Sequence, residues 1–167
     1  MSKINYVKGD AVYPDKTYPE DKNPKIICHI VNDENQWGAG FVLALSKRWK
    51  APEEDYRFLF DTPSVSPELK ALGSVRMIPV EYNYDNTIAV ANIIGQSGVN
   101  YPWRRDAPIR YDAVRTALTE VNQYAVGLES TLHMPRMGCG LGGGKWEEIE
   151  KIINEVITVD VTVYDLP

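Results

Sequence analysis

The stretch from Ser130 to Trp146 reads STLHMPRMGCGLGGGKW. Residues 130–134 are typical of a strand, residues 138–144 contain five glycines, and an apolar pattern at helical spacing begins at Trp146. Glycines between a strand and a helix let the backbone come close to a ligand, and N–H groups at the start of the helix can bind phosphate. The stretch therefore predicts an α/β fold with an anion-binding loop.

The same order of strand, glycines and helix occurs earlier in the chain. Residues 26–31 form a nearly continuous apolar run, as in a strand buried on both faces, and Gly38-Ala39-Gly40 precede a helical pattern over residues 41–49. Further strands are predicted at residues 3–8, 74–80, 87–94 and 159–164, further helices from Ala51 and over 110–126, and loops over 11–24 and 95–108. Alternating strands and helices predict an α/β sandwich with a mostly parallel or mixed sheet.

Length and composition fit one domain spanning residues 1–167, with 44% apolar and 25% charged residues. The net charge of −5 argues against non-specific binding to nucleic acid, and the chain contains no apolar run of about 20 residues that would span a membrane. The first residues do not resemble a signal peptide, and Cys28 and Cys139 form neither a disulfide framework nor a zinc motif. We therefore expect a cytoplasmic monomer with no metal, no cofactor and no membrane or nucleic-acid partner.

Two common nucleotide-binding motifs can be compared with the second glycine loop. Gly138-x-Gly140-x-x-Gly143 has the spacing of a dinucleotide fingerprint, but it lies late in the chain, and the nearest acid for a ribose, Asp160, falls in the last strand. A Walker loop requires glycine where Cys139 stands and serine or threonine where Trp146 stands. A nicotinamide dehydrogenase and ATP hydrolysis are thus disfavoured, whereas two glycine loops favour a ligand with two phosphates.

Both histidines lie in apolar strands. His29 is either a hydrogen-bonded core residue or, because it lies near the carboxyl end of its strand, a general base. Period-two alternation places it on the sheet face opposite Cys28 and Ile30. We interpret His133 as structural, and Cys139 has no readable histidine–acid partner that would make it a nucleophile.

Four segments together resemble the macrodomain family, which binds ADP-ribose. The segments are Tyr6 to Ala11 (first strand and adenine-contacting turn), His29 to Asn32 with Trp37 to Gly40 (first ligand loop), Met134 to Leu141 (phosphate loop) and Thr162 to Leu166 (last strand). The resemblance covers nearly the whole chain and is greatest for the branch of terminal ADP-ribose protein glycohydrolases, DNA de-ADP-ribosylating antitoxins and ADP-ribose 1″-phosphate phosphatases. It implies a three-layer α/β/α sandwich with a central mixed, mostly parallel six-stranded sheet.

The resemblance also implies site residues. Asp10 would accept a hydrogen bond from the adenine amino group, Ala11 and Leu166 would lie beside the adenine, and Asn32 would contact the distal ribose. The other ligand-binding positions lie in the two loops: Trp37, Gly38, Ala39, Gly40 and Phe41 in the first, and Arg136, Met137, Gly138, Cys139, Gly140, Leu141 and Gly142 in the second. Backbone amides from Gly38 to Phe41 and from Gly138 to Gly142 would hold the pyrophosphate.

The reaction implied by the resemblance depends on a few positions. The glycohydrolases use a lysine where this chain has Gln96 and an aspartate where it has Gly142. The phosphatases keep a histidine followed three residues later by an asparagine, which His29 and Asn32 match, and His29 would activate water. We therefore expect hydrolysis of ADP-ribose 1″-phosphate or of an ADP-ribosyl ester. The alternative is a non-catalytic module that binds or senses ADP-ribose, and the missing lysine disfavours removal of ADP-ribose from DNA.

Overall fold

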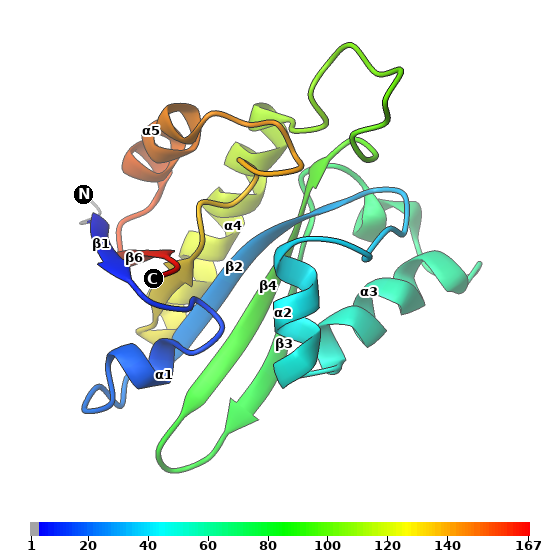
Figure 1. Ribbon diagram of the computed structural model, residues 1–167. Coiled ribbons are helices and arrows are strands. Elements are labelled where there is room, and N and C mark those ends of the chain that lie inside the picture. The colour runs from blue at the N-terminus through cyan, green and yellow to red at the C-terminus, as the bar shows by residue number, and fades with distance from the viewer. Residues whose placement is uncertain (1–3) are drawn as a thin grey trace.

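The computed structural model describes residues 4–167 and contains a six-stranded sheet (Figure 1). Its strand order is β1-β6-β5-β2-β4-β3. The strands are β1 (Ile4–Lys8), β2 (Lys25–Asn32), β3 (Val75–Tyr82), β4 (Thr87–Gln96), β5 (Thr131–Met134) and β6 (Val161–Asp165). Neighbouring strands are parallel except β3 and β4, which are antiparallel. The predicted mixed, mostly parallel sheet is confirmed, and only the first residue of the predicted strand 3–8 lies outside the described residues.

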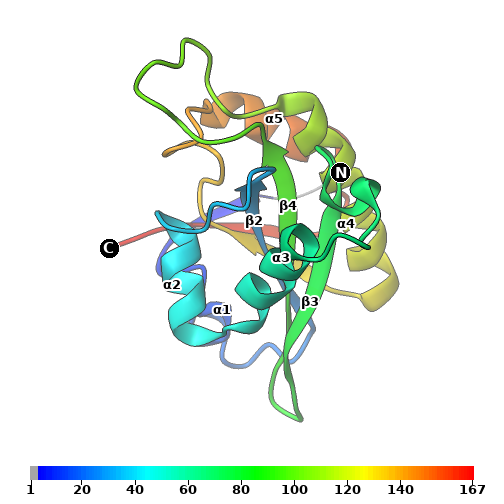
Figure 2. The same cartoon turned by 90° about the vertical axis from the view of Figure 1, so that its right-hand side faces the viewer.

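Helices cover both faces of the sheet, so the predicted three-layer sandwich is confirmed (Figures 1 and 2). α4 (Tyr111–Leu128) and α5 (Trp146–Val156) lie on one face, and α1 (Pro14–Thr17), α2 (Phe41–Arg48) and α3 (Ala51–Asp61) lie on the other. A 3-10 turn, η1 (Pro67–Lys70), precedes β3. The prediction of a loop over residues 11–24 is wrong at α1, where Pro14 at the first helical position favours a single turn.

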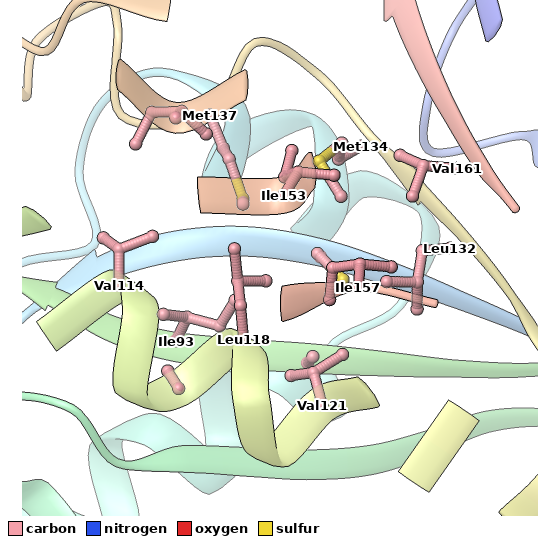
Figure 3. Close-up of a cluster of buried hydrophobic side chains, with 14 of the residues drawn as sticks. Ile93, Val114, Leu118, Val121, Leu132, Met134, Met137, Ile153, Ile157 and Val161 are labelled. Atoms are coloured by element: carbon pink, nitrogen blue, oxygen red, sulfur yellow. The ribbon is translucent and has the colours of Figure 1, made fainter. Parts of the chain in front are cut away.

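Two apolar cores result from this arrangement. In the first, Val114, Leu118 and Val121 of α4 pack with side chains of α5 and of the sheet (Figure 3). The second lies under α2 and α3 and includes Leu45 and Tyr56. β2 contributes to both cores because its successive side chains point to opposite faces.

The alternation along β2 decides where His29 points. Cys28 belongs to the first core and Ile30 packs against it, whereas the ring of His29 contacts the rings of Trp37 and Phe41 on the other side. The predicted placement of His29 opposite Cys28 and Ile30 is therefore confirmed. His29 thus lies on the α2 face of the sheet, below the first glycine loop.

The loops that follow β2, β4 and β5 gather at one end of the sheet (top of Figure 1). These are the carboxyl ends of parallel strands, where α/β sheets commonly bind ligands. Both glycine loops predicted from the sequence belong to this group.

Candidate functional site: a two-chambered cleft between the glycine loops

A cleft lies between the two glycine loops and divides into two adjoining chambers. Chamber A has a volume of about 280 Å³ and chamber B about 240 Å³. Both are lined by Ile30, Ala39, Val42, Gln96 and Leu141. Chamber A is completed by Val31, Asn32, Gln36, Gly38, Val99 and Asn100, and chamber B by His29, Gly40, Phe41, Pro135, Arg136, Met137, Gly138, Gly140 and Gly142.

Unpaired backbone N–H groups border the cleft on two sides. Within residues 4–167, the amides of residues 38–42 donate to no protein acceptor, and neither do those of Gly138, Gly140, Leu141 and Gly142. Every one of these residues lines a chamber. The first set includes the start of α2, where unpaired N–H groups and the helix dipole favour an anion. The cleft therefore has the donors that a pyrophosphate requires.

Asn32 at the end of β2 closes the loop that borders chamber A. Its Oδ1 accepts hydrogen bonds from the N–H groups of Glu34 (2.9 Å) and Gln36 (3.2 Å) and from the Tyr56 hydroxyl (2.7 Å). Its Nδ2 donates to the Gln36 carbonyl at 2.8 Å. Asn32 lies where the sequence placed it, but its carboxamide mainly holds the loop, and a single Nδ2 hydrogen remains for a ligand.

His29 lines chamber B, although only 1% of its surface is exposed. Its Nε2 lies 2.5 Å from Oδ1 of Asn92 in β4, which is also buried. Burial lowers the pKa of His29 to about 4, and the Asn92 hydrogen bond opposes this shift only in part. The imidazole is therefore neutral at pH 7, the form that a general base requires.

Gln96 and Gly142 stand together in the cleft. Gln96 lines both chambers, and its Nε2 donates to the Gly98 carbonyl at 3.3 Å. A Cβ on Gly142 would lie 2.8 Å from Gln96 Oε1 and 2.8 Å from the Gly138 carbonyl oxygen. Because real Cβ atoms do not approach backbone oxygen so closely, this loop conformation excludes an aspartate at position 142.

Arg136 is held at the outer side of chamber B. Its guanidinium forms two hydrogen bonds with Asp165 at the end of β6 and lies over the rings of Tyr6 (5.1 Å) and Trp146 (5.6 Å). The hydrogen bond from Arg136 lowers the pKa of Asp165. The second glycine loop is thereby attached to β1, α5 and β6.

Five of the residues that the resemblance assigned to ligand binding do not line the chambers. Trp37 is 3% exposed and donates its indole N–H to Ser46 at 2.8 Å, so it belongs to the core and presents no face for a ligand. Burial raises the pKa of the Cys139 thiol, whose Sγ contacts the Met137 carbonyl, and this disfavours the nucleophilic thiolate. Asp10, Ala11 and Leu166 lie outside both chambers, with Leu166 72% exposed. Ala11, by contrast, is buried at 3% exposure.

His133 has the structural role predicted for it. It is buried, and its ring nitrogens contact the Thr131 hydroxyl at 2.7 Å and the Tyr164 hydroxyl at 2.8 Å. Elsewhere in residues 4–167, no cluster of three His, Cys, Asp or Glu side chains is arranged to hold a metal ion. Within the same range, every helix is too short or too polar to cross a membrane.

The sequence interpretation missed Asn92, Tyr56 and Asp165. Asn92 stands in the apolar run Ile88 to Ile94, where a buried amide needs partners, and this signal was present in the sequence. Tyr56 looked like an ordinary apolar position of a helix, and no sequence signal pointed to its hydroxyl. Asp165 was part of the segment resembling the last strand, but its partner Arg136 lies 29 residues away.

Comparison with known proteins agrees with this geometry. No profile of a known protein family matches the chain. A solved structure described as a macrodomain protein from Streptomyces coelicolor is 41% identical in sequence, with a TM-score of 0.77 over 99% of this chain and all of the other. The chain belongs to the macrodomain family.

Curated relatives of this macrodomain are more distant. A Saccharomyces cerevisiae protein named ADP-ribose 1″-phosphate phosphatase is 26% identical, covering 99% of this macrodomain and 100% of the relative. A Bos taurus protein named ADP-ribose glycohydrolase OARD1 is 25% identical, covering 99% of this macrodomain and 93% of the relative. A third relative, chromodomain-helicase-DNA-binding protein 1-like from Danio rerio, is 27% identical, but this macrodomain spans only 14% of its length.

Proposed function

We propose that this macrodomain binds ADP-ribose and hydrolyses an ADP-ribose derivative, with ADP-ribose 1″-phosphate as the first candidate substrate. The observation that carries the proposal is the pair of facing loops whose unpaired N–H groups line one cleft. Two such loops match the two phosphates of ADP-ribose. The names of the yeast and bovine relatives support the same ligand and a hydrolytic reaction.

His29 is the residue proposed to activate water. The attacking water has to lie in chamber B, which His29 lines, if it is to pass its proton directly to His29. The water oxygen bonds to phosphorus while His29 accepts the water's proton. The bond between phosphorus and the 1″-oxygen breaks, that oxygen keeps the electron pair, and the proton on His29 passes to it. The products are ADP-ribose and inorganic phosphate.

An ADP-ribosyl ester is the second candidate substrate within the same proposal. Lysine-dependent cleavage of such an ester is not available, because the position of that lysine holds Gln96. His29-activated water would have to attack the ester bond itself.

Three observations favour a purely binding role. His29 is almost completely buried, and the chain has Gln96 and Gly142 where the family's glycohydrolases have lysine and aspartate. A module that senses ADP-ribose needs the amide donors but no base. Turnover separates the two functions, because both predict binding.

The first experiment is calorimetric titration with ADP-ribose, using AMP and NAD as controls. Selective binding of ADP-ribose supports the cleft as its site, and an absence of heat contradicts the ligand assignment. Phosphate release from ADP-ribose 1″-phosphate is then compared between the wild type and His29→Ala. We expect the variant to bind ADP-ribose but to lose phosphate release, and equal rates would exclude His29 as the base.

His133→Ala is the matched control for His29→Ala. It also removes a buried histidine, but His133 lies outside both chambers. We expect phosphate release to persist in this variant at temperatures where circular dichroism shows a folded protein. Loss of activity in both variants would indicate a general loss of structure.

A further inference from the structure

The two ring nitrogens of His29 have different surroundings. Nε2 contacts Asn92 Oδ1 at 2.5 Å, whereas Nδ1 is buried and has no hydrogen-bond partner among residues 4–167. Buried side-chain nitrogens without a partner are rare in native proteins. The unpartnered nitrogen also belongs to a residue that lines chamber B.

Asn92 determines which nitrogen carries the proton. Its Nδ2 lies 3.0 Å from the Pro52 carbonyl oxygen in α3, and a carbonyl can only accept a hydrogen bond. The nitrogen end of the amide must therefore face Pro52, and the oxygen end faces His29. Because that oxygen is an acceptor, His29 Nε2 must donate. In the neutral ring Nδ1 then has no hydrogen and keeps a free lone pair.

We propose that Asn92 is a positioning residue for the hydrolysis, because it holds His29 in the tautomer whose free base is Nδ1. The proposal rests on the proposed function, in which His29 takes a proton from water. The opposite tautomer would place a hydrogen on Nδ1 and leave Asn92 Oδ1 facing a bare nitrogen. Such a ring could not accept the proton of a water in chamber B through Nδ1.

Within residues 4–167, no charged group is among the causes that shift the pKa of His29. The rings of Trp37 and Phe41 face it from the first loop and α2, Asn92 faces it from β4, and Pro52 lies behind Asn92. Burial and the Asn92 contact are the causes that act on its pKa. Asn92 is therefore the side chain through which the protein selects the tautomer.

Nitrogen NMR on histidine-labelled protein tests the tautomer directly. The sequence contains two histidines, so the spectrum holds two ring systems, and Thr131→Val identifies His133 because Thr131 contacts that ring alone. For His29 in the wild type we expect a protonated Nε2 and an unprotonated Nδ1 at pH 7. A proton on Nδ1 would overturn the proposal without any variant.

Asn92→Ala removes the acceptor. We expect the His29 nitrogen signals to average between the two tautomers and kcat for phosphate release to fall roughly 10- to 100-fold, with the ADP-ribose Kd within about twofold of wild type. A purely structural role would lower the melting temperature and ADP-ribose affinity but would leave the tautomer and the kcat of the folded fraction unchanged. An unchanged kcat in folded Asn92→Ala overturns the proposal.

Asn92→Asp retains an acceptor for Nε2 and adds a negative charge beside the ring. We expect the tautomer to persist and the acid limb of the kcat profile to move to higher pH, because the carboxylate stabilises protonated His29. An acid limb that stays in place would contradict control of His29 by residue 92.

The same measurements separate this proposal from the proposed function. If the wild type binds ADP-ribose but releases no phosphate, hydrolysis is overturned, and with it any catalytic use of the tautomer. The NMR spectrum would still show whether Asn92 sets the protonation of His29. If the wild type hydrolyses the substrate and Asn92→Ala does so equally well, only the positioning role fails.

Discussion

Arg136 and Asp165 form a bidentate ion pair at the outer side of chamber B, with Nε 2.8 Å from Oδ1 and Nη2 3.1 Å from Oδ2. Arg136 is the only charged side chain among the described residues that line either chamber at pH 7. Its Nη1 has no partner within residues 4–167 and remains able to donate to a phosphate. Within residues 4–167, Arg136 thus adds a cationic side chain to the backbone amides and side-chain amides that line the cleft.

Arg136→Ala is expected to weaken ADP-ribose binding by roughly 10- to 150-fold, since a hydrogen bond to a charged group contributes about 1.5–3 kcal/mol. Arg136→Lys keeps the charge but loses the planar fork, and should fall between wild type and alanine. Calorimetry measures both. Arg76→Ala is the matched control, because Arg76 forms a similar bidentate pair with Asp55 away from the cleft. Equal affinities in Arg136→Ala and Arg76→Ala would exclude Arg136 as a ligand donor.

Two glycines of the same loop should respond differently to alanine. A Cβ at Gly142 would meet the Gly138 carbonyl at 2.8 Å, whereas a Cβ at Gly140 meets nothing within 4 Å. We expect Gly142→Ala to lose about 1–3 kcal/mol of unfolding free energy, the usual cost of overpacking, and Gly140→Ala to retain the stability of the wild type. Urea denaturation compares the two. Similar losses in both variants would show that the loop tolerates no side chain at either position.

Stability should fall as the pH drops from 6.5 toward 4. Burial lowers the pKa of His29 to about 4 and that of His133 to about 3, so the unfolded chain binds protons in this range and the folded chain does not. Each histidine makes its full contribution to the free energy of unfolding above pH 6.5. This contribution decreases at lower pH, by up to roughly 3 kcal/mol per histidine. Urea unfolding between pH 7 and 4.5 measures the slope.

A variant lacking one histidine tests the origin of that slope. His133→Gln should unfold with one proton fewer taken up in this interval than the wild type. Asp15 and Asp165 have lowered pKa values and lose their contribution only at more acidic pH, so they do not interfere above pH 4.5. An unchanged slope would mean that His133 titrates normally in the folded protein.

Tyr56→Phe is expected to loosen the border of chamber A. The Tyr56 hydroxyl contacts both Asn32 O (2.8 Å) and Asn32 Oδ1 (2.7 Å) from a buried position. Its loss should reduce the unfolding free energy by about 1–2 kcal/mol and weaken ADP-ribose binding, because the loop from Asn32 to Gln36 is less ordered. Tyr84→Phe, at a side chain 98% exposed, is the control and should change neither quantity. If Tyr56→Phe binds ADP-ribose with wild-type affinity, the order of this loop does not affect ligand binding.

Most of the strands and helices could be predicted from the sequence because their signals are local. The apolar run 26–31 and the helical pattern over 110–126 correspond to β2 and α4, with ends that differ by one or two residues. α1 was missed, since a single helical turn among prolines and charges leaves no periodic pattern.

The candidate site was only partly predictable. The glycine loops were found because glycines at strand–helix junctions are themselves a signal. The family resemblance implied that Trp37 binds the ligand, but its indole N–H donates to Ser46 of α2 and its ring packs against Tyr56 at 5.1 Å. An aromatic side chain beside a loop can pack into the core or face the ligand cleft. The choice depends on the packing of helices, which the sequence does not show.

The sequence by itself determined the order of the strands and of the helices longer than one turn, the two glycine loops at the carboxyl ends of strands, and the sheet face to which His29 points. These follow from periodicity and backbone sterics, which act between residues close together in the chain. Only the tertiary structure decided the surroundings of His29, since Asn92 lies 63 residues away and Pro52 is on another element. The parallel register that sets His29 beside Asn92 is a long-range contact, and it decides which nitrogen of the ring is free.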